Sequence, residues 1–242
     1  MLDKFKNRPL GWYLCTPLYA YRKLLHYRQI ILQNQVQSSQ EIWRRDSQFQ
    51  QFFIQAAGSG QDMYQYETEA YLLYYHALQV RGLSGEVAEV GVYQGGSAKL
   101  LAKTLPDKTI YLFDTFTGMP PTDPEHDMIP AGIFAETSLG KVESFLADCP
   151  NVSFHPGWFP ETAIPIEDKR FSFVHVDGDI YQTTQDAISF FYPRMTKGGI
   201  MAFHDYVQHD CPGVREAIHD FFDSAPETII FTPPRQCFIV KT

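Results

Sequence analysis

The sequence predicts an α/β fold in which helices cover both faces of a mostly parallel sheet. From about residue 85 onward, short apolar runs alternate with segments of helical periodicity, and strands separated by crossover helices form parallel sheets. The composition, 44% hydrophobic and 20% charged over 242 residues, is that of a globular protein. Only the turn signal Pro233-Pro234 separates the last two apolar runs. Such a link is too short for a crossover, so these runs are expected to form an antiparallel hairpin.

Seven strands and four helices are expected in this region. The helical segment 180–192 places Ile180, Thr184 and Ala187 on one face, and Pro212 suits the first turn of the last helix. An aromatic-rich run, Tyr64 to Tyr75, is expected to be a further helix that leads into the sheet. The expected strands cover residues 87–92, 110–116, 152–155, 171–177, 200–205, 228–231 and 237–240, and the four helices cover 96–105, 138–148, 180–192 and 212–223.

The first sixty residues differ from the rest and are expected to form a helical extension, with the main domain at 61–242. Residues 1–50 hold eight Lys or Arg against three Asp or Glu, whereas the whole chain has a net charge of −8. Apolar residues recur at near-helical spacing over 18–36. We expect these N-terminal helices to join copies of the chain into a homo-oligomer or to cover the main domain. Contact with an anionic membrane surface and a cleaved signal sequence are the alternatives.

Composition and charge disfavour several classes of function. The acidic main domain lacks the clustered Lys and Arg that nucleic acid requires, so no nucleic-acid partner is expected. No run approaches the about 20 apolar residues of a transmembrane segment. The four cysteines, Cys15, Cys149, Cys211 and Cys237, include no CxxC pair and indicate neither a disulfide framework nor a zinc knuckle. A cytoplasmic location is therefore expected.

Ligands of open α/β sheets bind at the carboxyl ends of the strands, so those ends define the candidate site. The first strand leads into Glu89-Val-Gly-Val-Tyr93-Gln-Gly95-Gly-Ser97. Glycines between a strand and a helix let the backbone approach a ligand and expose helical amide groups. Tyr93 stands where a dinucleotide fingerprint has its second glycine. A tight connection without a ligand is the alternative.

Asp114 closes the second strand, 25 residues after Glu89. A carboxylate at this position is well placed to accept hydrogen bonds from two ribose hydroxyls. Alone, Asp114 could equally cap a loop or a helix. Together with the glycine-rich turn, it favours an adenosine-containing cofactor.

Acidic residues also follow the fourth and fifth strands. Asp177 and Asp179 end the fourth, and His204-Asp205 ends the fifth. Carboxylates at the ends of buried strands are costly unless they are paired, protonated or bound to a cation. Because two adjacent strands carry them, we expect Asp177 and Asp205 to face each other and hold a hard divalent ion. Capping of the segments that follow is the alternative.

The segment 117–137 contains four prolines and little periodicity. Loops of this length inside a compact domain are usually functional. A disordered surface insertion is the alternative. If the segment borders a substrate, His126 is its most suitable contact.

The motifs EVGVYQGGS, YLFDTFTGMP, PGWFPET, DGDIYQTTQDAISFFYPRMTKGGIMAFHDY and CPGVREAI together resemble the macrocin O-methyltransferase family (TylF/MycF type) over roughly residues 62–242. Members are metal-dependent O-methyltransferases that use S-adenosylmethionine and methylate sugar hydroxyls of natural products. The resemblance implies a Rossmann-like class I methyltransferase fold with a seven-stranded sheet, and a small-molecule hydroxyl acceptor. It also implies S-adenosylmethionine and a divalent cation as cofactors.

The resemblance further implies roles for matching positions. Asp177 and Asp205 become metal ligands, Asp179 becomes the general base, and the loop 117–137 becomes a substrate lid. Within the cofactor set, Glu89, Gly91 and Gly95 would hold the methionine end, Asp114 the ribose, and Trp158 and Phe159 the adenine side. The full set of expected cofactor-binding residues is Glu89, Gly91, Tyr93, Gly95, Ser97, Asp114, Thr115, Trp158 and Phe159.

One position departs from the family pattern. The family usually has Asp-Asp at the end of the fifth strand, whereas this chain has His204-Asp205. An imidazole ligand shifts the preference from Mg²⁺, the expected ion, toward Mn²⁺, Fe²⁺ or Zn²⁺. His204 is therefore a candidate metal ligand, a candidate catalytic base, or neither.

Three other functions are weighed against this one. A nucleotide-dependent oxidoreductase is disfavoured because Tyr93 interrupts the glycine fingerprint. A catechol-type O-methyltransferase would use the same metal chemistry on a flat aromatic acceptor. A non-catalytic module that retains the cofactor fold is the third alternative.

Overall fold

The structure, a computed structural model, describes residues 41–57 and 67–242. The chain divides into two compact units, residues 1–47 and 48–242. The described part of the first unit contains the short helix η2 (Ile42–Arg45). The helix expected over 18–36 and the start of the aromatic run lie outside the described residues. None of the helices in the described ranges is long and apolar enough to cross a bilayer.

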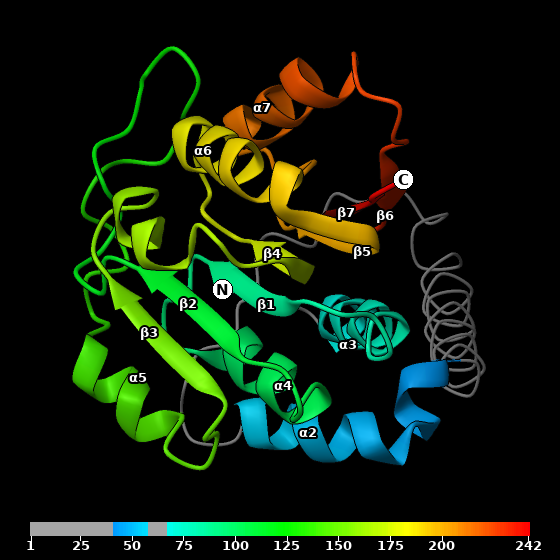
Figure 1. Cartoon of the computed structure of the whole chain (residues 1–242). Coiled ribbons are helices and arrows are strands. Elements are labelled where there is room, and N and C mark those ends of the chain that lie inside the picture. Colours follow the sequence, from blue (N-terminus) through cyan, green and yellow to red (C-terminus); the bar gives the residue numbers. More distant parts are fainter. Residues whose placement is uncertain (1–40, 58–66) are drawn as a thin grey trace, which may run out of the picture. The chain divides into compact units, whose positions relative to one another are not determined.

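A seven-stranded sheet forms the centre of the second unit (Figure 1). Its order is β3-β2-β1-β4-β5-β7-β6. The first five of these pair in parallel, and β7 runs antiparallel to both of its neighbours. The predicted parallel sheet with a C-terminal hairpin is therefore confirmed. The strands are β1 (Glu86–Val90), β2 (Ile110–Asp114), β3 (Val152–Pro156), β4 (Phe171–Val176), β5 (Met195–Phe203), β6 (Ile230–Thr232) and β7 (Gln236–Val240).

Strand β5 begins at Met195, five residues before the expected start at 200. The segment between contains Gly198 and Gly199, which are typical of a turn rather than a strand. Here they lie inside the strand, where its register against β4 is irregular. A side chain on Gly199 would approach the carbonyl oxygens of Thr196 and Ser172 to within 2.8 and 3.0 Å. Backbone crowding therefore explains glycine within this strand.

Helices cover both faces of the sheet, as predicted. In Figure 1, α3 and α4 lie on one face, and α6 and α7 lie on the other. The short helices η3 (Glu161–Ile166) and η4 (Tyr192–Arg194) follow β3 and α6. The longer helices are α2 (Ser47–Ala57), α3 (Glu67–Gln79), α4 (Gly96–Thr104), α5 (Leu139–Phe145), α6 (Tyr181–Phe191) and α7 (Pro212–Phe222).

The central strands are buried and parallel, so their carboxyl ends meet at one edge of the sheet. Every residue of β4 is buried, as its nearly continuous apolar sequence predicts for a strand covered on both faces. Phe171 of β4 packs edge-on against Phe191 of α6, with ring centroids 4.9 Å apart. Because β1, β2, β4 and β5 are parallel neighbours, the residues that follow them converge at this edge.

Candidate active site

A cavity of about 690 Å³ opens at the carboxyl ends of β1, β2, β4 and β5. This volume is typical of small-molecule sites. Two expected site residues, Glu89 and Gly95, do not line it. The expected residues that do line it are Gly91, Tyr93, Ser97, Asp114, Thr115, Trp158, Phe159, Asp177, Asp179, His204 and Asp205.

The glycine-rich turn after β1 has a backbone that requires glycine at two positions. Gly91 has φ +87°, and a side chain there would place Cβ 2.0 Å from the carbonyl oxygen of Asp177. Gly95 also has φ +87° and faces Val142 of α5 instead of the cavity. Tyr93 adopts a left-handed φ of +50°, so a non-glycine residue occupies a conformation that glycine favours. The turn thus brings the exit of β1 against the exit of β4.

Asp114 clamps this turn to the end of β2. Its Oδ2 accepts hydrogen bonds from the backbone N–H groups of Val92 and Tyr93, both at 2.8 Å. Its Oδ1 accepts one from the N–H of Phe116 at 2.6 Å. The carboxylate therefore has a structural role while it lines the cavity. A carboxylate offers about four acceptor positions, so it retains capacity for a further donor.

Glu89 is sealed in the sheet and not exposed to the cavity. Its side chain and that of His175 are both fully buried, and Nδ1 of His175 lies 2.8 Å from Oε1 of Glu89. The two residues are direct neighbours in the register of β1 and β4. Burial raises the pKa of Glu89, and the contact with His175 opposes that shift. In this structure Glu89 is thus held in an internal pair and does not line the cavity.

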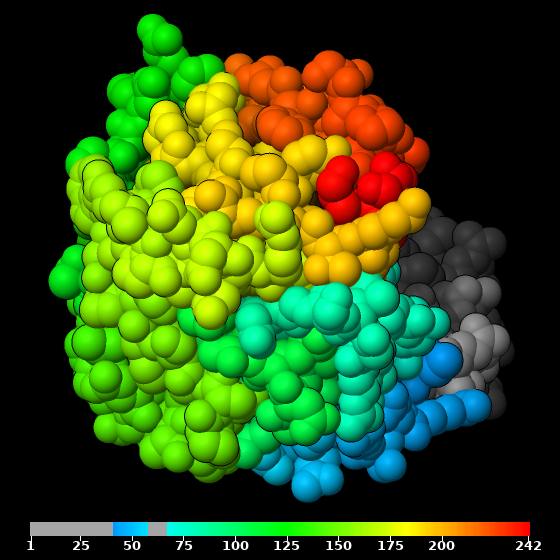
Figure 2. Space-filling view, in the orientation of Figure 1, coloured from blue at the N-terminus to red at the C-terminus, as the bar shows by residue number. Residues whose placement is uncertain are grey.

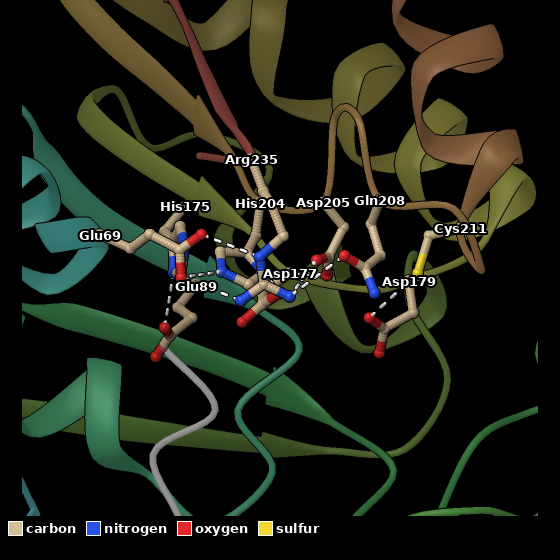
Figure 3. A network of polar contacts seen from close by, with 10 residues as sticks. All are labelled: Glu69, Glu89, His175, Asp177, Asp179, His204, Asp205, Gln208, Cys211 and Arg235. Carbon is tan, nitrogen blue, oxygen red and sulfur yellow. Dashed lines mark hydrogen bonds and ion pairs between the residues drawn. The ribbon is translucent and has the colours of Figure 1, made fainter. Parts of the chain in front are cut away.

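Asp177, His204 and Asp205 converge at the ends of β4 and β5 (Figure 3). Nδ1 of His204 lies 2.9 Å from Oδ1 of Asp177 and 2.8 Å from Oδ2 of Asp205. One ligand atom from each of the three residues lies within 4.8 Å of the other two. Burial acts to raise the pKa of Asp177, but the charge of His204 and its hydrogen bond outweigh burial and lower it. The predicted meeting of the two aspartates is confirmed.

Asp179 lies beside this group, 3.9 Å from the sulfur of the buried Cys211. Burial and the nearby charges of Asp177 and Asp205 raise the pKa of Asp179 well above its usual range. Both Asp179 and Asp205 have positive φ, +61° and +56°, and such strained residues cluster at functional sites. The N–H of Tyr181 in the first turn of α6 is bound by Asp127 instead of Asp179.

The loop 117–137 forms part of the cavity wall and docks on α6 and α7. Asp127 accepts a hydrogen bond from the N–H of Tyr181 at the start of α6, at 2.8 Å. The His126 ring stacks on Tyr181 and its Nδ1 lies 3.0 Å from Glu216 of α7. Figure 2 shows the loop (green) against α6 (yellow). His126 therefore anchors the loop and is not among the residues that line the cavity.

An ion pair between the buried Glu69 and Arg235, which lines the cavity, lies against the converging residues. Glu69 of α3 is fully buried and is held by Arg235, with Nε–Oε1 and Nη2–Oε2 distances of 2.9 Å. Nη1 of Arg235 lies 3.4 Å from Oδ1 of Asp205, and Oε2 of Glu69 lies 3.5 Å from Nε2 of His204. The pair thus touches two of the three converging residues (Figure 3).

Comparison with known proteins identifies the family. The sequence profile described as macrocin-O-methyltransferase (TylF) matches residues 74–228. The chain belongs to the macrocin O-methyltransferase family. The mycinamicin III 3''-O-methyltransferase of Micromonospora griseorubida is 33% identical over 162 residues, which cover 59% of this chain and 62% of that protein. The demethyldecarbamoylnovobiocin O-methyltransferase of Streptomyces niveus is 28% identical over 170 residues, covering 60% and 62%. The chain thus matches less than two thirds of the length of these curated relatives.

Solved structures agree with this assignment. The O-methyltransferase NovP superposes with a TM-score of 0.63 at 26% identity, covering 72% of this chain and 79% of NovP. The calicheamicin methyltransferase CalS11 gives a TM-score of 0.64 at 20% identity, covering 72% and 78%, and supports the fold. The Rossmann-like class I methyltransferase fold expected from the resemblance is therefore confirmed.

Three residues of the site, Cys211, Glu69 and Arg235, were not predicted from the sequence. Cys211 lines the cavity beside Asp179. The spacing of the cysteines in the sequence bears only on disulfide and zinc motifs and did not indicate this position. Glu69 and Arg235 lie outside the matched residues 74–228. Glu69 stands in the polar first turn of α3, before the apolar run that begins at Ala70, where an acidic residue is ordinary, so its burial could not be predicted from the sequence. No sequence feature indicated that Arg235 would reach it.

Proposed function

We propose that this protein is an S-adenosylmethionine-dependent O-methyltransferase that methylates a hydroxyl group of a glycosyl natural product. The observation that carries the proposal is one cavity with two chemically distinct parts. The glycine-rich turn and Asp114 border it on one side, and Asp177, Asp179 and Asp205 border it on the other. Family membership supports methyl transfer, and a relative named as a mycinamicin III 3''-O-methyltransferase supports a natural-product acceptor.

The cavity suits S-adenosylmethionine, which supplies the methyl group from its sulfonium when bound. Its volume of about 690 Å³ lies in the usual range for small-molecule sites. We assign the backbone of the glycine-rich turn to the methionine end. Asp114 would contact the ribose while it continues to hold the turn. Trp158, whose side chain is about half exposed, and Phe159 border the region that we assign to adenine.

The cluster of Asp177, His204 and Asp205 suits a divalent cation, which supplies Lewis-acid polarisation of an acceptor hydroxyl when bound. Nδ1 of His204 lies 2.9 and 2.8 Å from the two carboxylates, so these three side chains would be the ones to hold the ion. Two carboxylates with one imidazole form a donor set for Mg²⁺ or Mn²⁺, and the imidazole favours Mn²⁺.

The chain itself would supply the base and the alignment. Asp179 would accept the proton of the acceptor hydroxyl, because burial and the neighbouring carboxylates give this side chain a raised pKa that suits a base. We assign His204 as a ligand and not as the base, because its Nδ1 already faces both Asp177 and Asp205. Correct alignment of two reactants contributes about 7–11 kcal/mol to catalysis.

Isothermal titration tests both halves of this proposal. The purified protein is titrated with S-adenosylmethionine and S-adenosylhomocysteine, then with Mn²⁺ or Mg²⁺ after chelation. We expect micromolar binding of both sulfur compounds. We also expect a separate Mn²⁺ heat that Asp177→Asn abolishes and that Asp168→Asn, at an exposed position, retains. Metal binding without cofactor binding would contradict the assignment of S-adenosylmethionine as the methyl donor. Cofactor binding without metal binding would contradict the assignment of a cation site. If neither the sulfur compounds nor the metal binds, the proposed function would fail and the similarity to methyltransferases would be one of fold alone.

The acceptor is tested by product formation. A neutral glycoside with neighbouring hydroxyls and a simple catechol are each incubated with the protein, S-adenosylmethionine and Mn²⁺, and methylated products are detected by mass spectrometry. Methylation of the glycoside supports the proposal, whereas methylation of the catechol alone would favour the catechol-type alternative. Binding of both cofactors without turnover of either acceptor class would favour a non-catalytic module.

Two other expectations stay predictions. Homo-oligomerisation through the N-terminal helices depends on residues 1–40, which lie outside the described ranges. A cytoplasmic location is likewise proposed from the composition alone.

A further inference from the structure

The ion pair between Glu69 and Arg235 joins two distant parts of the chain beside the candidate metal ligands His204 and Asp205. Glu69 lies in the first turn of α3, and Arg235 lies between β6 and β7, 166 residues later. The carboxylate of Glu69 is fully buried, and two parallel hydrogen bonds hold it. Two parallel bonds of this kind fix the planes of both groups, which a single contact does not.

Each partner of this pair also faces a different candidate ligand. Oε2 of Glu69 lies 3.5 Å from Nε2 of His204, a buried atom that makes no hydrogen bond with the described residues. Nη1 of Arg235 lies 3.4 Å from Oδ1 of Asp205. A movement of about 0.5 Å would bring either contact into hydrogen-bond range.

We propose that Glu69 and Arg235 are positioning residues for the metal site, which together fix the ring of His204 and the carboxylate of Asp205. This inference rests on the proposed assignment of His204 and Asp205 as ligands. A histidine that offers Nδ1 to an ion carries its proton on Nε2, and an acceptor for that proton fixes the ring orientation. Glu69 is that acceptor, and Arg235 holds Glu69 in place.

The same geometry explains how the chain accommodates a histidine between these carboxylates. An imidazole is longer than a carboxylate and has a second polar atom, which is buried here and requires a partner. Glu69 supplies the partner, and Arg235 balances the added negative charge. Neither residue lies within the stretch matched by the family profile.

The test uses variants that conserve charge, so that a change in metal binding reports geometry. Glu69→Asp shortens the acceptor by one methylene group, and Arg235→Lys removes the two-pronged geometry while it keeps the positive charge. Glu67→Asp is the matched control in the same helical turn, where Glu67 binds Gln50. Arg194→Lys is the second control, because Arg194 binds the carbonyls of Glu167 and Phe190.

Titration with Mn²⁺, followed by electron paramagnetic resonance of the free ion, gives the affinity of each variant. Loss of an outer partner of a metal ligand weakens binding about 10–100-fold. We expect a decrease of this size for Glu69→Asp and Arg235→Lys, with S-adenosylhomocysteine affinity unchanged and with both controls close to wild type. Variants that bind Mn²⁺ as wild type does would overturn the inference and leave the proposed function intact.

Nitrogen NMR of the metal-free protein separates the inference from the proposed function. The protein is labelled with ¹⁵N-histidine, and His204→Asn identifies the signal. We expect a slowly exchanging Nε2 proton on His204 in wild type and Glu67→Asp, and a rapidly exchanging one in Glu69→Asp. If wild type fails to bind Mn²⁺, the metal assignment fails, and this measurement alone decides whether Glu69 holds the ring. Rapid exchange in wild type would overturn the inference.

Discussion

Two buried histidines in this protein have carboxylate partners from neighbouring strands, but their surroundings differ. His175 pairs with Glu89 across β4 and β1. His204 contacts Asp177 and Asp205 at the ends of β4 and β5. The two rings lie 6.5 Å apart between centroids, and His175 is 0% and His204 4% exposed. Residue type and burial alone therefore do not distinguish them.

Charge balance and access to the cavity distinguish the two sites. Glu89 and His175 form one carboxylate paired with one imidazole, and neither lines the cavity. His204 lies among Asp177, Asp179 and Asp205, and all four line it. An excess of carboxylates that faces a cavity attracts a cation, whereas a balanced pair sealed in a sheet is structural.

The largest effect on stability is expected from breaking the sealed pair. His175→Ala leaves the carboxylate of Glu89 buried without its partner, and removal of one member of a buried pair costs about 3–5 kcal/mol. Urea unfolding followed by circular dichroism measures the loss. Replacing both partners with leucine removes the uncompensated group, so the double variant is expected to recover most of that loss. A single variant as stable as wild type would show that the pair has no structural role.

A smaller effect, with a defined pH range, is expected at a second sealed carboxylate. Burial alone would raise the pKa of Glu227, but hydrogen bonds from Lys241 and Tyr192 outweigh burial and lower it to about 2. The unfolded value is near 4.5, so the stabilisation is present above pH 4.5 and is lost as the pH falls toward 2. Glu227→Gln should lose about 1–3 kcal/mol at pH 7. Unfolding measured from pH 7 to pH 3 should then show a flatter acid limb than wild type does, and an unchanged limb would contradict the assignment.

Much of this contrast could be predicted from the sequence, because strand order and strand ends follow from local patterns. Alternating strands and helices determine a parallel sheet, and parallel strands bring Asp177 and Asp205 to one edge. The sequence could not distinguish Glu89 from these residues. Glu89 is buried within β1, one residue before the strand ends. Its pairing with His175 depends on the register between β1 and β4.

Contacts between segments distant in the chain could not be predicted from local sequence patterns. Glu69 and Arg235 are 166 residues apart and meet because α3 packs beside β5 while the turn between β6 and β7 reaches the same edge. The early start of β5 was missed for a related reason. Gly199 meets a packing requirement inside the sheet and Gly198 adopts a φ of +81°, although a local pattern associates such glycines with turns.

The smallest effect on stability, of opposite sign, is expected at the cavity. Burial and the charges of Asp177 and Asp205 raise the pKa of Asp179 above 3.8, its usual value, so ionisation of Asp179 destabilises the folded protein. The free energy of unfolding should therefore fall as the pH rises above about 4. Asp179→Asn removes that charge and should gain about 1 kcal/mol at pH 8 in the presence of a chelator.

Turnover of the Asp179→Asn variant should fall about 100–10,000-fold because the base is lost. Urea unfolding at pH 5 and pH 8 measures the gain, and saturating Mn²⁺ should reduce it by stabilising wild type. A variant less stable than wild type at pH 8 would show that Asp179 is a structural residue like Glu89, and the contrast between the two sites would then not extend to it.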